Sequence, residues 1–138
     1  MTFNFSEFKN KKIIVTGSST GIGFETGVEF LNLGANVIFH GNQSINDLEA
    51  RVKTKSQSQN FKIFKSDFTE LSQVDDFMNN AINYLDGLDI LINNAGTMVG
   101  RYQLDTISEK DFLKIFDLNA KSAYFVTKSA CTIFKKQN

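Results

Sequence analysis

Apolar residues gather in four short runs along the chain, at residues 12–16, 36–40, 61–65 and 88–93. Short runs rich in isoleucine, valine, leucine and phenylalanine are typical of buried strands. The stretches between the runs are long enough for the helical crossovers that parallel strands require. The pattern therefore predicts an α/β domain in which helices cover a parallel sheet.

Helical periodicity fills the stretches between the runs. It is clearest over residues 74–85, where apolar side chains return at i, i+3 and i+4 and form one face. Ser72, with Asp75 three positions later, predicts the N-terminal cap of this helix. After a loop that reaches about residue 108, a second apolar stripe predicts one long or kinked helix: Phe112, Ile115, Phe116, Asn119, Ala123, Val126, Ala130 and Phe134.

Two further helices complete the alternation. One covers residues 25–33, and Gly34 is expected to end it as a left-handed residue. The other follows the run at 36–40, and Ser44 with Asp47 predicts its capping box. The apolar positions of this weaker helix are Ile45, Leu48 and Val52.

Length and composition narrow the class of protein. The chain has 138 residues, of which 41% are hydrophobic and 22% charged, and this fits one domain over residues 1–138. Its 15 basic residues balance 15 acidic ones, so we expect neither a nucleic acid nor a membrane as partner. With one histidine and one cysteine, Cys131, a metal site is not expected. No secretory or membrane-spanning segment is recognised, which favours the cytoplasm.

A glycine-rich turn follows the first predicted strand. Residues 16–23 read Thr-Gly-Ser-Ser-Thr-Gly-Ile-Gly, and the first helical pattern begins directly after them. Gly17 permits a tight turn, Gly21 lets the backbone approach a ligand, and Gly23 lets the helix pack close to the strand. The free N–H groups and the positive end of the helix dipole favour a phosphate there, and a pyrophosphate fits. The alternative is a glycine turn of purely structural use.

This turn resembles the T-G-x-x-x-G-x-G cofactor loop of the short-chain dehydrogenase/reductase family. Residues 93–96 read Asn-Asn-Ala-Gly and are similar to the family's NNAG motif after its fourth strand. Asparagine amides at such a place can tie neighbouring strands together. The resemblance covers the N-terminal part of the family domain. It implies a Rossmann-type, doubly wound parallel sheet that is incomplete, truncated after about four strands and the following long helix. Its implied cofactor-binding residues are Gly17, Ser19, Gly21, Ile22, Gly23, Asn93, Ala95 and Gly96.

Three more positions gain a role from the resemblance. Asp67 matches the acidic residue that caps the adenine amino group in relatives, with Phe68 beside it, and an ordinary turn or helix-capping aspartate is the alternative. Asn119 matches the catalytic asparagine that bends its helix and holds a water of the proton relay, and a structural kink is the alternative. Because Asn119 falls on the apolar stripe, an unpaired buried amide would cost about 1–3 kcal/mol. We therefore expect its amide to be hydrogen-bonded.

The resemblance implies NAD or NADP as cofactor, with a slight preference for NADP. Relatives that prefer NAD often carry Asp at the position of Gly41, and relatives that prefer NADP often carry Arg near Asn42. Neither residue is present. The missing carboxylate favours the phosphorylated cofactor, and a protonated His40 would help to neutralise its 2′-phosphate. The alternative for His40 is an ordinary surface residue.

The family's catalytic serine and its Tyr-x-x-x-Lys motif are expected in segments beyond this sequence. Ser122, Tyr124 and Lys128 imitate the motif. The serine, however, stands only two positions from the tyrosine and points elsewhere on a helix. We interpret Tyr124 as helix packing and Lys128 as its solvated edge. Because a positioned acid or base contributes about 10²- to 10⁴-fold, the chain alone is expected to be a poor catalyst.

The resulting hypothesis is an oxidoreductase that transfers hydride between NAD(P)(H) and a small carbonyl or alcohol substrate. Its second half would come from a complementing C-terminal chain, and the long helix and the open sheet edge favour such a partner or a homo-oligomer. The alternatives are a dinucleotide-binding module without chemistry and an inactive gene remnant. The sequence does not specify the substrate.

Overall fold

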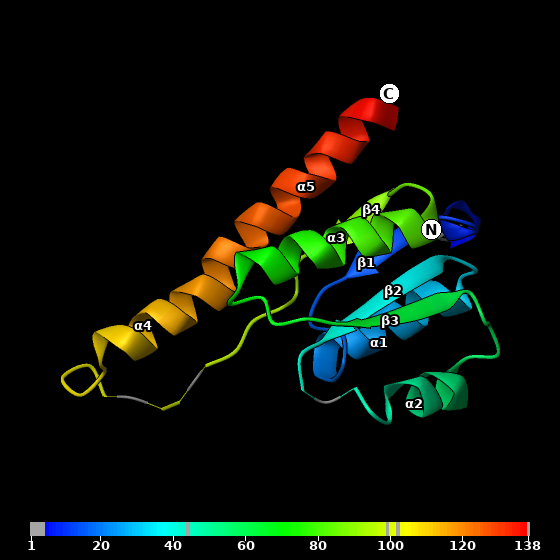
Figure 1. Cartoon of the computed structure of the whole chain (residues 1–138). Coiled ribbons are helices and arrows are strands. Elements are labelled where there is room, and N and C mark those ends of the chain that lie inside the picture. Colours follow the sequence, from blue (N-terminus) through cyan, green and yellow to red (C-terminus); the bar gives the residue numbers. More distant parts are fainter. Residues whose placement is uncertain (1–4, 44, 99, 102, 138) are drawn as a thin grey trace, which may run out of the picture.

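A parallel sheet of four strands forms the centre of the computed structural model, which describes residues 5–43, 45–98, 100–101 and 103–137. In sequence order the strands are β1 (Lys12–Val15), β2 (Asn36–Gly41), β3 (Phe61–Lys65) and β4 (Ile90–Ile92). Their order across the sheet is β3-β2-β1-β4, and every pairing is parallel (Figure 1). All four predicted strands and the parallel sheet are confirmed.

Helices cover both faces of this sheet (Figure 1). On one face, α1 (Gly21–Asn32) and α2 (Leu48–Lys55) pack over Ile13 and Val15 of β1. On the other face, α3 (Leu71–Leu85) and α5 (Ser122–Gln137) pack over Ile14. Because side chains alternate between the two faces of a strand, β1 contributes to both apolar cores. A short 3-10 helix, η1 (Phe5–Phe8), precedes the sheet.

The strand order places a change of direction between β1 and β4. From β1 the chain moves outward through β2 to β3, and then returns to the other side of β1 as β4. Loops that leave the carboxyl ends of β1 and β4 therefore run in opposite directions and leave a crevice between them. Ligands of open α/β sheets bind at such a position.

The helix ends agree only in part with the capping signals. Gly34 has φ +87° and ends α1 in the left-handed region, as predicted. The N-cap of α3 is Glu70, without a side-chain cap bond, so Ser72 lies inside the first turn and the prediction that it caps the helix is wrong. Asp47 is the N-cap of α2 but makes no side-chain cap bond, and Ser44 lies outside the described residues.

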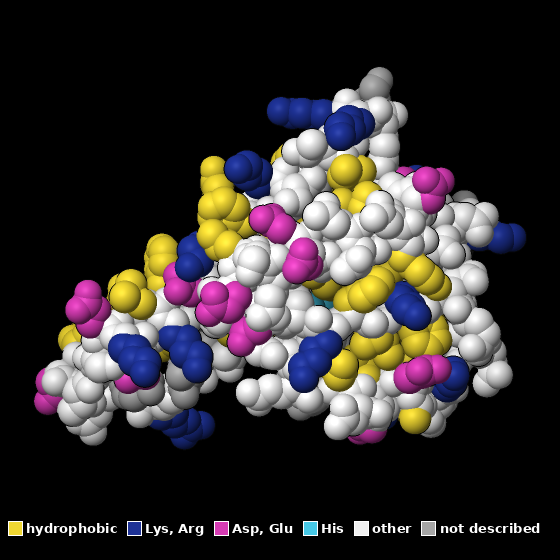
Figure 2. Space-filling view, viewed as in Figure 1, with side chains coloured by type: hydrophobic (Ala, Val, Ile, Leu, Met, Phe, Trp, Pro, Cys, Tyr) yellow, Lys and Arg dark blue, Asp and Glu magenta, His cyan; other side chains and the backbone are white. Residues whose placement is uncertain are grey.

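The predicted long helix is present in three continuous pieces. α4 (Glu109–Phe116) runs into a π-helical segment, η2 (Asp117–Lys121), and then into α5. Its apolar stripe is only partly covered: Val126 and Ala130 are buried, whereas Phe112 and Phe116 are each 54% exposed. Figure 2 shows hydrophobic side chains along this part of the surface. The stripe thus serves as core only in α5.

β4 forms one edge of the sheet. Its three residues are half-buried, whereas the last three residues of β1 beside it are fully buried. The expected open edge at the fourth strand is therefore present, and it is short. Within the described part of the chain, no helix is long and apolar enough to cross a membrane.

Candidate functional site

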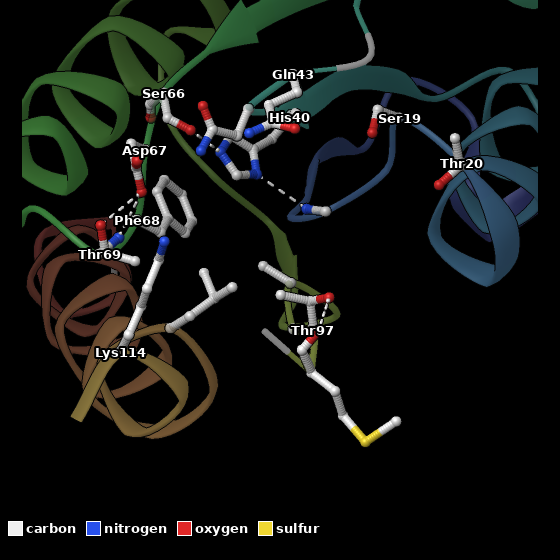
Figure 3. A pocket seen from close by; sticks show the side chains of 17 residues that line it. Ser19, Thr20, His40, Gln43, Ser66, Asp67, Phe68, Thr69, Thr97 and Lys114 are labelled. Atoms are coloured by element: carbon white, nitrogen blue, oxygen red, sulfur yellow. Dashed lines mark hydrogen bonds between the residues drawn. The ribbon is translucent and has the colours of Figure 1, made fainter. Parts of the chain in front are cut away.

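A cleft of about 500 Å³ opens at the carboxyl ends of the strands (Figure 3). Each of the four strands sends its following loop to the cleft wall, and η2 and α4 close one side. The lining residues are Gly17, Ser19 and Thr20 after β1, residues 40–43 at the end of β2, residues 66–69 after β3, residues 95–98 after β4, and Lys114 and Leu118. The crevice expected from the strand order is therefore a real cavity.

The three glycines of the turn meet different surroundings. Gly17 (φ +60°) and Gly21 (φ +61°) both have a left-handed backbone, which L-residues with a side chain adopt at a cost. A Cβ on Gly17 would lie 2.6 Å from the Cα of Ala95, and a Cβ on Gly23 would overlap the side-chain amide of Asn94. At Gly21 a Cβ would meet nothing within 4 Å. The turn is crowded on the β4 side and open at Gly21.

Helix α1 begins at Gly21, so the N–H groups of its first turn have no partner within the helix. The preceding amides are used differently, because the Gly17 and Ser18 N–H groups are both bonded to His40. The positive end of the helix dipole lies at the same place as these free N–H groups and also attracts negative charge. Ile22 is 81% exposed and lies in the first turn of α1, next to the N–H groups that attract an anion. The local structure suits an anionic group.

Asn94 ties the glycine turn to the end of β4. Its side-chain nitrogen donates to the carbonyl oxygens of Thr16 at 3.0 Å and Gly17 at 2.8 Å. The Thr16 hydroxyl oxygen accepts from the backbone N–H groups of Asn94 and Ala95, both at 3.0 Å. Asn93 instead donates to the hydroxyl of Thr127 on α5 at 2.8 Å. The expected tie between neighbouring strands is present, and Asn94 makes it.

Asp67 stands on the cleft wall after β3. Its Oδ1 accepts the backbone N–H of Thr69 at 3.0 Å and the Thr69 hydroxyl at 2.8 Å. Partial burial opposes the charged form, but these bonds, a bond from Asn42 and the charge of Lys114 outweigh it and lower the pKa of Asp67. Asp67 is thus a carboxylate at neutral pH that shapes its own turn and still faces the cleft. Phe68 is only 1% exposed as a whole residue, and it packs behind Asp67 at the cleft wall.

His40 is neither exposed nor charged. Its ring is 3% exposed, Nδ1 accepts the Gly17 N–H at 2.9 Å, and Nε2 lies 3.1 Å from the Ser66 carbonyl oxygen. Because Nδ1 accepts, the ring hydrogen belongs on Nε2, which donates to Ser66. Burial lowers the pKa of His40 to about 4, against smaller opposite effects of the Ser66 bond and the charge of Asp67. The sequence-based hypotheses of a surface histidine and of a cation for a 2′-phosphate are both wrong.

The burial of His40 predicts that acid destabilises the fold. Its pKa is about 4 in the folded chain and 6.5 for an ordinary histidine, so the unfolded chain takes the proton more readily. Stability is therefore full above about pH 6.5 and falls as the pH drops towards 4. The expected loss is about 2 kcal/mol between pH 7.5 and pH 5. Urea denaturation at several pH values measures it, and since the chain has one histidine, a flat profile in this window would contradict the neutral buried ring.

Asn119 lies in the π-helical segment. Its side-chain nitrogen donates to the carbonyl oxygens of Ile115 at 2.8 Å and Thr97 at 2.9 Å. A Cβ on Gly96 would come within 2.6 Å of its Oδ1. The expected hydrogen bonding and the interrupted helix are confirmed, and π-bulges are frequent at functional sites. The implied burial is wrong, because Asn119 is exposed in this chain.

Ser122, Tyr124 and Lys128 of α5, which imitate the catalytic motif, do not form a site. The hydroxyl of Ser122 is directed at the Leu118 carbonyl oxygen at 2.6 Å, and Ser122 is buried. Tyr124 is 67% exposed, so its interpretation as helix packing is wrong. Lys128 lies over the ring of Phe125 at 5.5 Å. The serine and the tyrosine therefore face different surroundings, as their spacing predicted.

The cleft gathers only part of the predicted site. Gly17, Ser19, Asp67, Phe68, Ala95 and Gly96 line it, whereas Gly21, Ile22, Gly23, Asn93 and Asn119 are not among the lining residues. Lys114 is a lining residue that the sequence reasoning missed. No signal in the sequence distinguishes it from a lysine on a solvated helix face. In the described part of the chain, no group of histidine, cysteine and acidic residues could hold a metal ion.

The parallel sheet with its glycine turn and crevice defines a Rossmann-type α/β domain. Residues 11–138 match the family described as short chain dehydrogenase, and the chain belongs to this family. The resemblance noted from the sequence is thereby confirmed.

Among curated proteins, the chain is similar to a "Probable NADP-dependent mannitol dehydrogenase" of Yarrowia lipolytica, with 32% identity over 130 residues, 94% of this chain and 47% of that protein. It is also 32% identical to the "Sorbose reductase sou1" of Schizosaccharomyces pombe, over 99% of this chain and 54% of that protein. The chain spans about half the length of the curated relatives it matches.

Solved structures show the same relation. The crystal structure of "NADH-dependent reductase A1-R′ complexed with NAD" superposes with a TM-score of 0.87 and 30% sequence identity. The match covers 97% of this chain and 56% of that chain. The Rossmann-type fold is therefore confirmed for the described residues, and it corresponds to about half of the related structure.

Proposed function

We propose that the cleft binds a nicotinamide dinucleotide and that the chain forms the cofactor half of a short-chain dehydrogenase/reductase. The observation that carries the proposal is that the glycine turn, as far as the N-cap of α1 at Thr20, and the carboxylate of Asp67 line one cavity. An anionic diphosphate suits the free N–H groups, and an adenine amino group suits the Asp67 carboxylate. The NAD-bound relative with 30% identity supports this assignment.

The residues of the site would divide the dinucleotide between them. Asp67, with Phe68 beside it, would hold the adenine, while Ser19, Gly21, Ile22 and Gly23 would meet the diphosphate. Three residues after β4, namely Asn93, Ala95 and Gly96, would border the nicotinamide half. Asn93 would act indirectly, because its side-chain amide is bonded to Thr127 of α5. Bound there, the cofactor would supply or accept a hydride.

The cofactor preference follows from the end of β2. A Cβ on Gly41 would lie 2.7 Å from the Cβ of Ser19 and 2.9 Å from Cγ2 of Ile45, so these two side chains crowd out a carboxylate that would repel a 2′-phosphate. Arg51 donates to the Ser19 carbonyl oxygen at 2.8 Å, but its Nε is paired with Oδ2 of Asp47 at 3.1 Å, so its charge behind the turn is compensated. The missing carboxylate therefore favours NADP slightly over NAD. His40, being neutral, adds nothing to this preference.

Hydride transfer to a small carbonyl compound, or from an alcohol, would need more than this chain. Asn119 is the proposed catalytic residue on the described chain, where it would hold a water of the proton relay. The serine, tyrosine and lysine of the family would come from a complementing C-terminal segment or chain, and a homo-oligomer could form through the exposed face of α4. A dinucleotide-binding module without chemistry, or an inactive remnant without a stable product, is the alternative.

A bulky residue at Gly21 should abolish nucleotide binding without unfolding the chain. The space next to Gly21 is open in the structure, so a valine there would project into the region assigned to the diphosphate. We expect Gly21→Val to weaken the binding of NAD⁺ and NADP⁺ by more than about 100-fold, since close backbone contacts with phosphate are lost. Isothermal titration calorimetry measures the change.

The matched control is Gly34→Val. Gly34 also has a positive φ, but it lies at the other end of α1, where the nearest atom to an added Cβ is Cγ of Lys9 at 3.4 Å. This variant carries a similar backbone strain and should bind the nucleotides like the unmodified chain. Undiminished binding by Gly21→Val would remove the proposal.

A further inference from the structure

Three hydrogen bonds join His40 to the start of the glycine turn. Its backbone carbonyl oxygen accepts the Ser18 N–H at 2.7 Å, and its backbone N–H donates to the Ser18 hydroxyl oxygen at 2.8 Å. The third bond, from the Gly17 N–H to Nδ1 at 2.9 Å, is the one that uses the side chain. The first two use only the backbone of residue 40 and can form with any residue other than proline. The imidazole therefore fixes the Gly17 amide in particular.

The opposite edge of the ring is attached to the loop after β3. Nε2 donates to the Ser66 carbonyl oxygen at 3.1 Å, and the ring stacks on Phe68 with 3.9 Å between centroids and 17° between planes. Phe77 of α3 meets the ring at 4.9 Å with its edge. Ser66 and Phe68 stand on either side of Asp67. One buried ring thus connects the two loops that form opposite walls of the cleft (Figure 3).

We propose that His40 is a positioning residue of the nucleotide site, whose Nδ1 holds the Gly17 amide and thereby sets the glycine turn for a diphosphate. The inference rests on the proposed function. The ring engages the Gly17 amide, and the N–H groups of the first turn of α1 stay available for the ligand. Its stacking on Phe68 keeps Asp67 at a fixed place across the cleft from them. The charged side chains on the cleft wall around the ring are Asp67 and Lys114.

Two substitutions of His40 test the bonds of its two ring nitrogens separately. In His40→Asn the side-chain oxygen stands near the place of Nδ1 and can accept the Gly17 N–H. In His40→Gln the side-chain nitrogen reaches the place of Nε2 and can donate to Ser66, but Gly17 loses its acceptor. Both variants lose the stacking on Phe68, so thermal unfolding should show similar losses of stability for the two.

Nucleotide affinity, measured by calorimetry with ADP, should distinguish them. We expect His40→Asn to bind ADP within about 3-fold of the unmodified chain. His40→Gln should bind about 10-fold more weakly, since the Gly17 N–H would turn towards another acceptor and move the backbone that meets the diphosphate. Equal affinities of the two variants, or weaker binding by His40→Asn, would overturn the inference. Absence of ADP, NAD⁺ and NADP⁺ binding by the unmodified chain would instead overturn the proposed function.

A measurement on the unmodified protein tests the inference even if these variants fail to fold. The chain has one histidine, so ¹⁵N NMR of the unmodified protein reports on His40 alone. We expect a protonated Nε2 and an unprotonated Nδ1, with or without ADP. A ring with hydrogen on Nδ1 could not accept the Gly17 N–H, and it would overturn the inference.

Discussion

Replacement of Gly17 by alanine is expected to destabilise the fold by about 2–5 kcal/mol. The added Cβ would lie 2.6 Å from the Cα and 3.0 Å from the nitrogen of Ala95, and backbone atoms cannot rotate aside as a side chain can. Overpacking of this kind typically costs about 1–3 kcal/mol. The φ of +60° adds about 1–2 kcal/mol for a residue with a Cβ. Urea denaturation monitored by circular dichroism measures the sum.

Gly21→Ala is the matched control for this prediction. Its φ of +61° equals that of Gly17 within one degree, but nothing lies within 4 Å of the added Cβ. Only the backbone cost of about 1–2 kcal/mol should therefore remain. The difference between the two variants isolates the contact with Ala95. If both lost the same stability, the close approach of the glycine turn to the loop after β4 would be refuted.

The largest effect is expected from completion of the domain. The 138-residue chain should show no measurable nicotinamide-dependent reduction of a carbonyl compound. Joining it to the C-terminal half of a relative, with that protein's serine and Tyr-x-x-x-Lys, should raise the rate by at least about 10²- to 10⁴-fold, the contribution of a positioned acid or base. The added segment would extend the sheet at β4, where the edge strand is half-buried. Oxidation of NADPH or NADH followed at 340 nm measures the rate.

Two variants of this chain test which residues take part in the completed enzyme. Tyr124→Phe should leave the rate unchanged, because Tyr124 lies on the exposed face of α5 and its neighbour Ser122 is bonded elsewhere. Asn119→Ala should lower kcat more than it raises KM, since its proposed role concerns the proton relay. A large loss with Tyr124→Phe would show that the motif on α5 is the functional one. No activity in any completed chain would favour a binding module or a remnant.

The strands and most helices could be predicted because each follows from a local pattern. The runs at 36–40 and 61–65 form strands at those positions, with β2 one residue longer. Helix ends were less predictable. Ser72 has the spacing of a cap, yet α3 begins earlier because Glu70 adopts the extended backbone of an N-cap. A capping signal of two residues is weak when the neighbouring turn can start the helix instead.

The candidate site was predictable where glycine geometry decides it. The predicted tight turn at Gly17 is present, and Gly17 and Gly21 both have a positive φ, a backbone that few other residues tolerate. Lys114 was missed because its approach to the cleft depends on how α4 is placed relative to β3. Nothing within α4 itself distinguishes it from a lysine on a solvated face.

The sequence by itself determined the alternation of strands and helices and the glycine turn, because hydrophobic period and backbone conformation are properties of neighbouring residues. Only the tertiary structure decided the state of His40, which depends on partners 23 and 26 positions away, at Gly17 and Ser66. It likewise decided that Asn119 meets Thr97, 22 positions away, while remaining exposed. Burial and hydrogen-bond partners come from distant segments, so protonation states and side-chain roles appear only when the chain is folded.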